Sequence, residues 1–229
     1  MQVKHEGTEI LKVLCGSRAY GLEDDDSDHD YHGIFVVPTS RILSINSNLK
    51  ETSWVEGEDQ DNTAWEIGHF LKMALHCNPT VLETFVAPVV STTPLGDELR
   101  TLFPHVLSRK YIYDAFRGYA SNQRKKMFEP TGTDLEKRSR KAAVAYLRSL
   151  LHGEYLLLNG TYNTKIDSAY WIRTLKDIKR GFSGKAVVIS LAEELEDGLR
   201  KAYGVSAIPL TNNMDVVNEF LLRVRKENW

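Results

Sequence analysis

The feature that most constrains the fold is a strand-like run that ends at Gly16-Ser17 and is followed, ten residues later, by an Asp-x-Asp pair. Residues 9–15 (EILKVLC) are rich in aliphatic side chains, and Gly16 interrupts them. Asp28 and Asp30 stand where a second run begins, the β-branched and aromatic residues 31–37 (YHGIFVV). This pattern predicts a strand, a short helical turn, an acidic loop and a second strand.

The two aspartates of the pair have the spacing of metal ligands. Because side chains alternate along a strand, Asp28 and Asp30 are expected on one face, with Cα atoms roughly 6.6 Å apart at about 3.3 Å per residue. Mg²⁺ binds through one or two protein carboxylates together with substrate phosphates. Such a pair forms half of a two-metal phosphoryl-transfer site, whose ions lie about 3.5–4 Å apart.

The Gly16-Ser17 pair has the properties of a phosphate-binding turn. Glycine lets the backbone approach an anion closely, and the residues after it open a short helix whose free N–H groups face that anion. Ser17 adds a hydroxyl donor, and Arg18 either reaches the same oxygens or packs outward. Taken separately, a Gly-Ser pair is an ordinary turn and an acidic pair is a solvated loop. Their combination around two strands favours a site.

The residues after the second strand continue the α+β pattern. We predict a short helix around residues 40–45, an edge strand over 51–55, a turn at 57–60 and a strand from Asp61. Apolar residues then recur at helical spacing from Glu66 until Asn78-Pro79 ends the helix.

Beyond residue 91 the sequence is helical. The 3.6-residue pattern predicts helices over 95–107, 111–127, 135–159, 167–179, 185–203 and 215–226. The predicted fold class is therefore α+β, with a small mixed β-sheet core followed by a helical C-terminal half. We place the domain boundary at residue 90, giving a core over 1–90 and a helical region over 91–229.

Composition limits the partners and the compartment. With 29 basic and 31 acidic residues there is no overall basic field, so any contact with nucleic acid is local. Cys15 and Cys77 lie in apolar stretches and form no disulfide framework. We find no signal peptide and no run of roughly 20 apolar residues, so we expect a cytoplasmic protein without a membrane span. The oligomeric state is left open.

Two groups of basic residues lie in the helical half. Arg138, Lys141 and Arg148 fall near one face of a predicted helix, where they contact a triphosphate or a nucleic-acid strand, or form a solvated cationic face. Arg124-Lys125-Lys126 lies between Tyr119 and Phe128, a combination that can bind single strands, but three consecutive charges spread around a helix. For this second group we favour the surface interpretation.

His32 shares strand parity with Asp30, which places it toward the same face. We interpret it as a strand histidine hydrogen-bonded to a neighbour. Imidazole is softer than the ligands that Mg²⁺ sites prefer, so no zinc site is predicted.

The motif resembles the signature of the DNA polymerase beta-like nucleotidyltransferase superfamily. Within it, Tyr20-Gly21-Leu22 and Ser27-Asp28-x-Asp30-x-x-Gly33 are similar to a bacterial and phage branch of predicted nucleotidyltransferases, one lineage of which is linked to RNA repair. The likeness continues through Asp61-x-x-x-Trp65-Glu66-Ile67 and Asn78-Pro79-Thr80-Val81-Leu82-Glu83. It is specific over most of residues 10–90 and weaker beyond.

The resemblance implies an activity and a third carboxylate. It implies transfer of a nucleoside monophosphate from a nucleoside triphosphate such as ATP to an acceptor hydroxyl, with release of pyrophosphate and two Mg²⁺ ions, for which Mn²⁺ can substitute. Asp61 matches the third metal carboxylate and the general base. Glu58, Asp59 and Glu66 are the competing candidates for that role.

The residues that choose the acceptor are not part of the motif. An RNA or tRNA 3′ end is the favoured acceptor, and a protein hydroxyl, modified with AMP or UMP, is the alternative; a small molecule such as an aminoglycoside is also open. A module that binds nucleotides or a partner without turnover is the rival from another class. A purely structural protein is the third interpretation.

Overall fold

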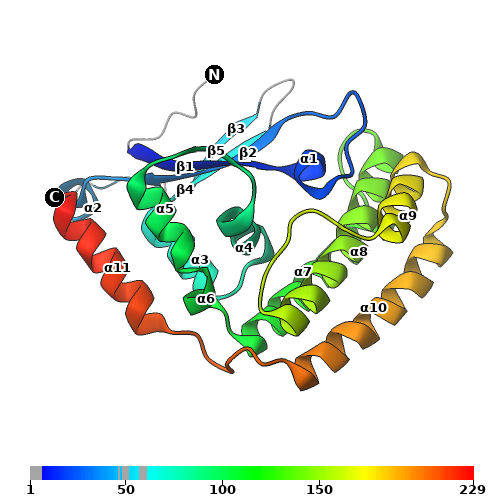
Figure 1. Ribbon diagram of the computed structural model, residues 1–229. Helices are drawn as coiled ribbons and strands as arrows, with labels where there is room; N and C mark the ends of the chain where they lie inside the picture. The colour runs from blue at the N-terminus through cyan, green and yellow to red at the C-terminus, as the bar shows by residue number, and fades with distance from the viewer. Residues whose placement is uncertain (1–6, 46, 48–51, 57–60) are drawn as a thin grey trace. The chain divides into compact units, whose positions relative to one another are not determined.

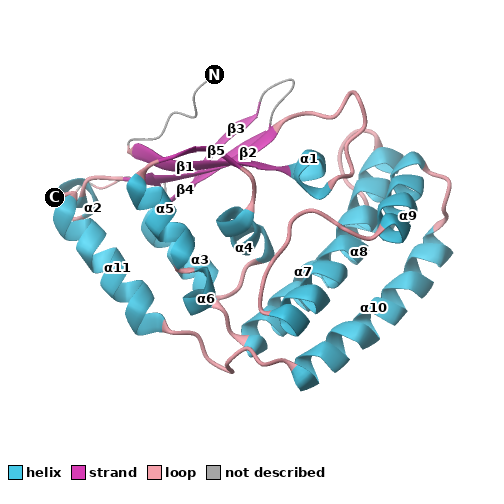
Figure 2. Ribbon diagram, viewed as in Figure 1, coloured by secondary structure: helices cyan, strands magenta, loops and turns pink. Residues whose placement is uncertain are grey.

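The computed structural model describes residues 7–45, 47, 52–56 and 61–229, with residues 52–56 and 61 described at the level of the backbone. Its strands form a five-stranded sheet in the order β3-β4-β2-β1-β5 (Figures 1 and 2). Strands β2 and β4 run parallel, and the other neighbours are antiparallel. The strands are β1 (Thr8–Cys15), β2 (Asp30–Val36), β3 (Thr52–Glu56), β4 (Asp61–Glu66) and β5 (Val89–Thr92). The predicted α+β class with a small mixed sheet is confirmed.

Helices lie between the strands along the chain and follow the last of them. In chain order they are α1 (Gly16–Tyr20), α2 (Thr39–Ile42), α3 (Ile67–Leu75), α4 (Pro79–Val86), α5 (Pro94–Thr101), α6 (Phe103–Val106), α7 (Arg109–Phe128), α8 (Leu135–Asn159), α9 (Ala169–Arg180), α10 (Lys185–Val205) and α11 (Met214–Glu227). Among the described residues, no helix has the length and apolar character needed to cross a bilayer.

The chain divides into two compact units, each made of more than one segment of the sequence. The first, which we call the sheet unit, comprises residues 1–76, 80–107 and 212–229. The second, the helical unit, comprises residues 77–79 and 108–211. The domain boundary that we placed at residue 90 stays a prediction, while residues 91–107 and α11 share contacts with the sheet unit.

The sheet unit is built on a core of strand residues. Val13 of β1 and Ile34 of β2 are fully buried, as is Phe70 of α3. In Figure 1, α3, α5 and α11 lie on one side of the sheet. Burial of these apolar side chains supplies the main driving force for assembling the layers.

A buried ion pair joins the C-terminal helix to the sheet. Arg225 of α11 donates two hydrogen bonds to the Glu66 carboxylate, at 2.7 and 2.8 Å. Glu66 is 2% exposed and also accepts from the Gly68 N–H, so it caps α3. The Thr39 hydroxyl donates to the Arg225 carbonyl, which fixes α11 against the residues after β2. Helix α11 is therefore an integral part of the sheet unit.

The helical unit is organised around α8, which packs against α7, α9 and α10. Leu147, Leu150 and Leu156 of α8 are fully buried. The helix begins after Asp134, whose side chain accepts from the Lys137 N–H. It ends at Gly160 in the left-handed conformation, as helices commonly do.

Several predicted elements were wrong in detail. The single helix predicted over 95–107 is two helices, since α5 ends at Thr101 and α6 starts at Phe103; Pro104 has no N–H to continue the α5 ladder. Strand β5 and helix α4 were not predicted. The turn predicted at residues 57–60 lies outside the described residues. Both cysteines are free and buried, as expected.

Candidate active site

The Gly16-Ser17 turn and the Asp28-x-Asp30 pair meet in the structure, where Gly16 lies against Asp30. Gly16 ends β1 with φ +70°, a left-handed conformation that favours glycine. A Cβ at this position would overlap Oδ2 of Asp30 and lie 3.1 Å from its Cγ. The antiparallel register pairs Cys15 with Asp30, which explains how the strand ends bring the glycine and the carboxylate together. Only glycine leaves room for this carboxylate beside the β1 turn.

Asp28 lies two residues before Asp30, in the loop that leads into β2, and is exposed. The loop is held from α1, because Arg18 donates from Nε and Nη2 to the Ser27 carbonyl at 3.0 and 2.7 Å. Ser27 in turn bonds Asp24 through its N–H and its hydroxyl. Arg18 therefore fixes the residue that immediately precedes Asp28, an arrangement that the sequence did not predict.

The backbone of Asp61 lies level with that of Asp30. In the parallel pair of β2 and β4, Tyr31 is opposite Asn62, and each strand begins one residue earlier, at Asp30 and at Asp61. Neighbouring strands lie about 4.8 Å apart. Asp30 and Asp61 thus start adjacent strands at the same edge of the sheet.

The competing candidates for the third carboxylate are in different situations. Glu66 lies at the far end of β4, where Arg225 and the Gly68 N–H bind its carboxylate. Glu58 and Asp59 lie outside the described residues. The structure therefore gives Glu66 a structural partner and leaves Asp61 as the acidic residue at the Asp30 edge of β4.

His32 is a structural histidine. Its Nδ1 is 3.0 Å from the Thr84 hydroxyl, and its ring packs edge-on against Trp65 with centroids 4.9 Å apart. These contacts join β2 to α4 and confirm the prediction that His32 is hydrogen-bonded to a neighbour.

Lys141 and Arg148 belong to α8 of the helical unit, whereas Gly16, Ser17 and Arg18 belong to the sheet unit. Lys141 is exposed and Arg148 is half-buried. Burial lowers the pKa of His152 to about 3, and the charge of Arg148 acts in the same direction. Arg148 and His152 are four positions apart on α8, about one helical turn.

The donors at the sheet edge fit a hard divalent cation. Asp28 and Asp30 supply carboxylate oxygens, the ligand type that Mg²⁺ prefers. Among the side chains that the structure describes, no three His, Cys, Asp or Glu residues gather as a metal-binding group. The side chain of Asp61 is not among those described.

Comparison with known proteins identifies the class to which this geometry belongs. A model of the RNA repair pathway DNA polymerase beta family (RlaP) matches residues 2–175, well over half of the chain. This match makes the protein a polymerase beta-like nucleotidyltransferase by family. The chain belongs to the RNA repair pathway DNA polymerase beta family, which agrees with the resemblance of its motifs.

Other comparisons add little. A solved structure described as a nucleotidyltransferase-like protein from Exiguobacterium sibiricum 255-15 is 9% identical, with a TM-score of 0.27. The alignment covers 96% of this chain and 74% of that one. A TM-score this low carries no weight in assigning the fold. No curated protein matches the chain.

Proposed function

We propose that this protein transfers a nucleoside monophosphate from a nucleoside triphosphate to an acceptor hydroxyl and releases pyrophosphate, an activity of the EC 2.7.7 type. The contact between Gly16 and the Asp30 carboxylate is the observation that carries the proposal. A catalytic carboxylate beside a backbone turn without a side chain suits a reaction in which phosphate oxygens and metal ligands meet. Membership of the family supports the same class of reaction.

Each proposed site residue has a separate task. Gly16, Ser17 and Arg18 bind the triphosphate, and Lys141 and Arg148 are further proposed nucleotide contacts. Asp28, Asp30 and Asp61 would hold two Mg²⁺ ions. When bound, these ions supply charge neutralisation at the transferring phosphoryl group.

The chain's own contribution is positioning. Arg18 holds the loop before Asp28, and Gly16 leaves space beside Asp30, which supports the proposal that these two aspartates are positioned before the nucleotide binds. Asp61 would accept the proton of the attacking hydroxyl. Orienting the reactants and placing charge in advance account for most of the rate enhancement in reactions of this kind.

We favour an RNA or tRNA 3′ end as the acceptor, since the family is described by its RNA repair pathway. We place catalysis in residues 1–90 and the choice of acceptor in the helices after residue 91. A protein hydroxyl that receives AMP or UMP is the alternative.

The test uses nucleoside triphosphates labelled at the α-phosphate, with Mg²⁺ or Mn²⁺, and total RNA or cell lysate. Metal-dependent label on RNA supports the favoured acceptor, and label on protein supports the alternative. No label on RNA, on protein or on a small molecule of the lysate would support a binding module.

Asp30→Asn is the matching variant and should reduce transfer at least about 100-fold. Asp25→Asn is its control, because Asp25 is an exposed aspartate of the same loop that lies outside the motif. Equal activity in the Asp30→Asn variant and the wild type would contradict the assignment. A circular-dichroism melt of each variant checks that the fold is intact.

A further inference from the structure

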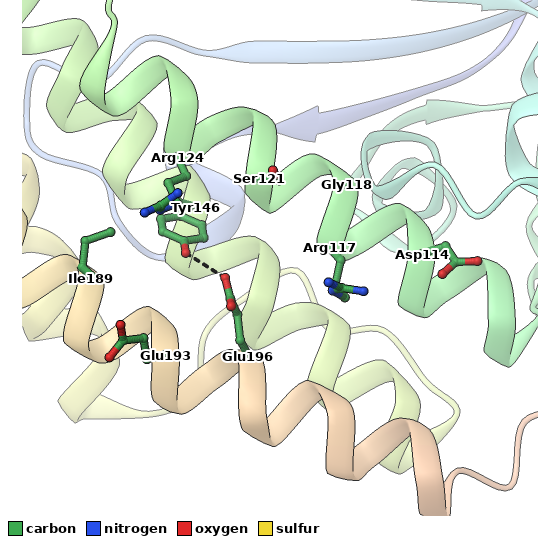
Figure 3. A pocket seen from close by; sticks show the side chains of 9 residues that line it. All are labelled: Asp114, Arg117, Gly118, Ser121, Arg124, Tyr146, Ile189, Glu193 and Glu196. Carbon is green, nitrogen blue, oxygen red and sulfur yellow. Dashed lines mark hydrogen bonds between the residues drawn. The ribbon is translucent and has the colours of Figure 1, made fainter.

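A polar groove of about 500 Å³ lies within the helical unit, between α7 and α10 (Figure 3). Tyr146 of α8 lies between the two helices. The residues that line the groove are Asp114, Arg117, Gly118, Ser121, Arg124, Tyr146, Ile189, Glu193 and Glu196. Its volume falls in the range of about 300–1,000 Å³ that is typical of small-molecule sites.

The groove walls are single faces of two antiparallel helices. The lining residues of α7 and of α10 recur every three or four positions, so each set forms one stripe. At one end, Tyr113 of α7 packs on Tyr203 of α10, with ring centroids 4.8 Å apart. At the other, Phe128 of α7 lies 5.3 Å from the Lys185 ammonium. These contacts join α7 to α10 on either side of the lining residues along the two helices.

The two walls differ in charge: the α7 wall carries two arginines and one carboxylate, Asp114, and the α10 wall carries two carboxylates. Arg117 and Arg124 lie on α7, and Glu193 and Glu196 lie on α10. Within the part of the chain that the structure describes, neither arginine forms an ion pair with these carboxylates. Both guanidiniums instead stack over aromatic rings of their own helix, Arg117 on Tyr113 and Arg124 on Phe128. A ligand with an anionic group for the arginines of α7 and hydrogen-bond donors for the carboxylates of α10 fits this groove.

Tyr146 orders the centre of the groove. Its side chain is 2% exposed, and its hydroxyl donates to Glu196 at 2.8 Å. Burial and the hydrogen bond to Glu196 raise the pKa of Tyr146, so the phenol stays protonated. Glu196 is therefore engaged by the protein, and Glu193 is the carboxylate of this wall that faces a ligand.

Gly118 lies in the interior of the 20-residue helix α7, where glycine costs about 1 kcal/mol relative to alanine. A Cβ at this position would meet nothing within 4 Å. No contact inside the protein therefore requires glycine here. Close approach of a ligand to the helix backbone, between Arg117 and Ser121, would account for it.

We propose that this groove is a nucleotide-binding site in which the phosphate lies against Gly118 and Ser121, between Arg117 and Arg124. Glu193 accepts hydrogen bonds from the ribose hydroxyls or the base amino group. A nucleotide combines the anion and the donors that the two walls require. The shared chemistry is a nucleoside phosphate, supplied either as a free mononucleotide or as a unit of an RNA strand. The proposal goes beyond the proposed function, because it requires binding without turnover.

The test measures binding in EDTA, which separates it from metal-dependent transfer. The four nucleoside 5′-monophosphates and a short 5′-phosphorylated oligoribonucleotide are titrated by calorimetry. Tighter binding of the oligonucleotide identifies a strand as the source, and binding of mononucleotides alone identifies free nucleotides; either supports the site. Binding of neither, or of an amino acid or polyamine in their place, overturns it.

Arg124→Gln should weaken nucleotide binding about 10-fold or more, since it removes a charge-assisted hydrogen bond. Lys125→Gln is the matched control, which removes the same charge from the next residue of α7, outside the groove lining. An equal loss in both variants would indicate non-specific charge attraction and overturn the site. Asp30→Asn should bind nucleotide at the groove as wild type does, so failure of catalysis and failure of this site remain distinguishable.

Gly118→Ala provides a variant that cannot lose binding through unfolding. The helix should become more stable, raising the Tm by about 2–4 °C. The added methyl group projects into the groove and should weaken binding several-fold. Stabilisation with unchanged affinity would overturn the close approach of the phosphate to α7.

Discussion

The sheet unit and the helical unit each present a polar site, but they encode it in different ways. In the sheet unit, Gly16 and Asp30 are 14 residues apart. They meet because β1 and β2 are antiparallel neighbours, so the end of β1 lies beside the start of β2. In the helical unit, Arg117 and Glu193 face one groove although more than 70 residues separate them. A strand edge concentrates its chemistry in a short motif, whereas a groove between helices distributes it over positions three or four apart.

The ion pair of α11 gives the largest expected effect and tests how firmly the sheet edge is supported. Arg225→Gln leaves the Glu66 carboxylate buried and unpaired, which should cost about 3–5 kcal/mol in the free energy of unfolding. Urea denaturation measures it. Arg223→Gln is the control, because Arg223 pairs with Glu98 on the exposed side of the same helix. Its unfolding midpoint should not shift measurably. Equal effects would contradict the role of burial.

Asp61→Asn tests whether the sheet-edge site includes β4. We expect transfer to fall about 10²–10³-fold, as for Asp30→Asn, because both carboxylates would serve one reacting centre. Single-turnover transfer in Mg²⁺ is the measurement. The double variant should lose little more than either single variant, since residues that act as a unit are not additive. Wild-type transfer in Asp61→Asn would exclude β4 from the site.

Two glycines with nearly the same backbone compare the units directly. Gly16 has φ +70° and Gly160 has φ +68°, but only Gly16 has a neighbour, Asp30, in the place of a Cβ. Gly160→Ala should cost about 1–2 kcal/mol from the left-handed backbone alone. Gly16→Ala should cost about 1 kcal/mol more and reduce transfer as well, because the Asp30 carboxylate must move. If chemical denaturation gave the same loss in the free energy of unfolding for both variants, and transfer were retained, the Asp30 side chain would move aside without cost.

His152 makes the helical unit sensitive to acid. Its pKa is lowered from 6.5 to about 3, so the unfolded chain binds a proton that the folded chain does not. Stability is complete above pH 6.5 and is lost as the pH falls toward 3. Between pH 6.5 and 5 the loss should be roughly 2 kcal/mol, at about 1.4 kcal/mol per pH unit. Denaturant titrations of wild type and His152→Gln at both pH values give this difference. Parallel losses would remove His152 as the cause.

The parts of the fold that were predicted correctly are those with local signals. Helix α8 was predicted with the bounds observed, because its apolar period is sustained and Gly160 ends it. The strands on either side of the Gly16 motif were also predicted to within a residue or two. Strand β5 was missed because its residues are all exposed and show no alternation between buried and exposed positions.

The candidate site was predictable to the extent that it is a motif. The meeting of Gly16 with Asp30 follows from adjacent antiparallel strands. The clamp of Arg18 on the Ser27 carbonyl does not, since a side chain bound to a backbone oxygen leaves no sequence pattern. The groove was missed because its lining comes from three helices. The local signals for it were Gly118, a glycine within a helical pattern, and Arg124, for whose basic group we favoured the surface interpretation.

Most of the helical unit, residues 108–211, is inserted in the sequence between two segments of the sheet unit. This insertion affects the order in which a growing chain folds. The ends of the inserted segment are joined, since Arg109 donates its N–H to the Pro209 carbonyl at 2.8 Å and the Ser108 hydroxyl donates to Leu210 at 2.7 Å. During synthesis from the N-terminus, this segment leaves the ribosome before α11 does. The helical unit can therefore fold first. The sheet unit forms its buried ion pair later, because Arg225, the partner of Glu66, is among the last residues to be translated.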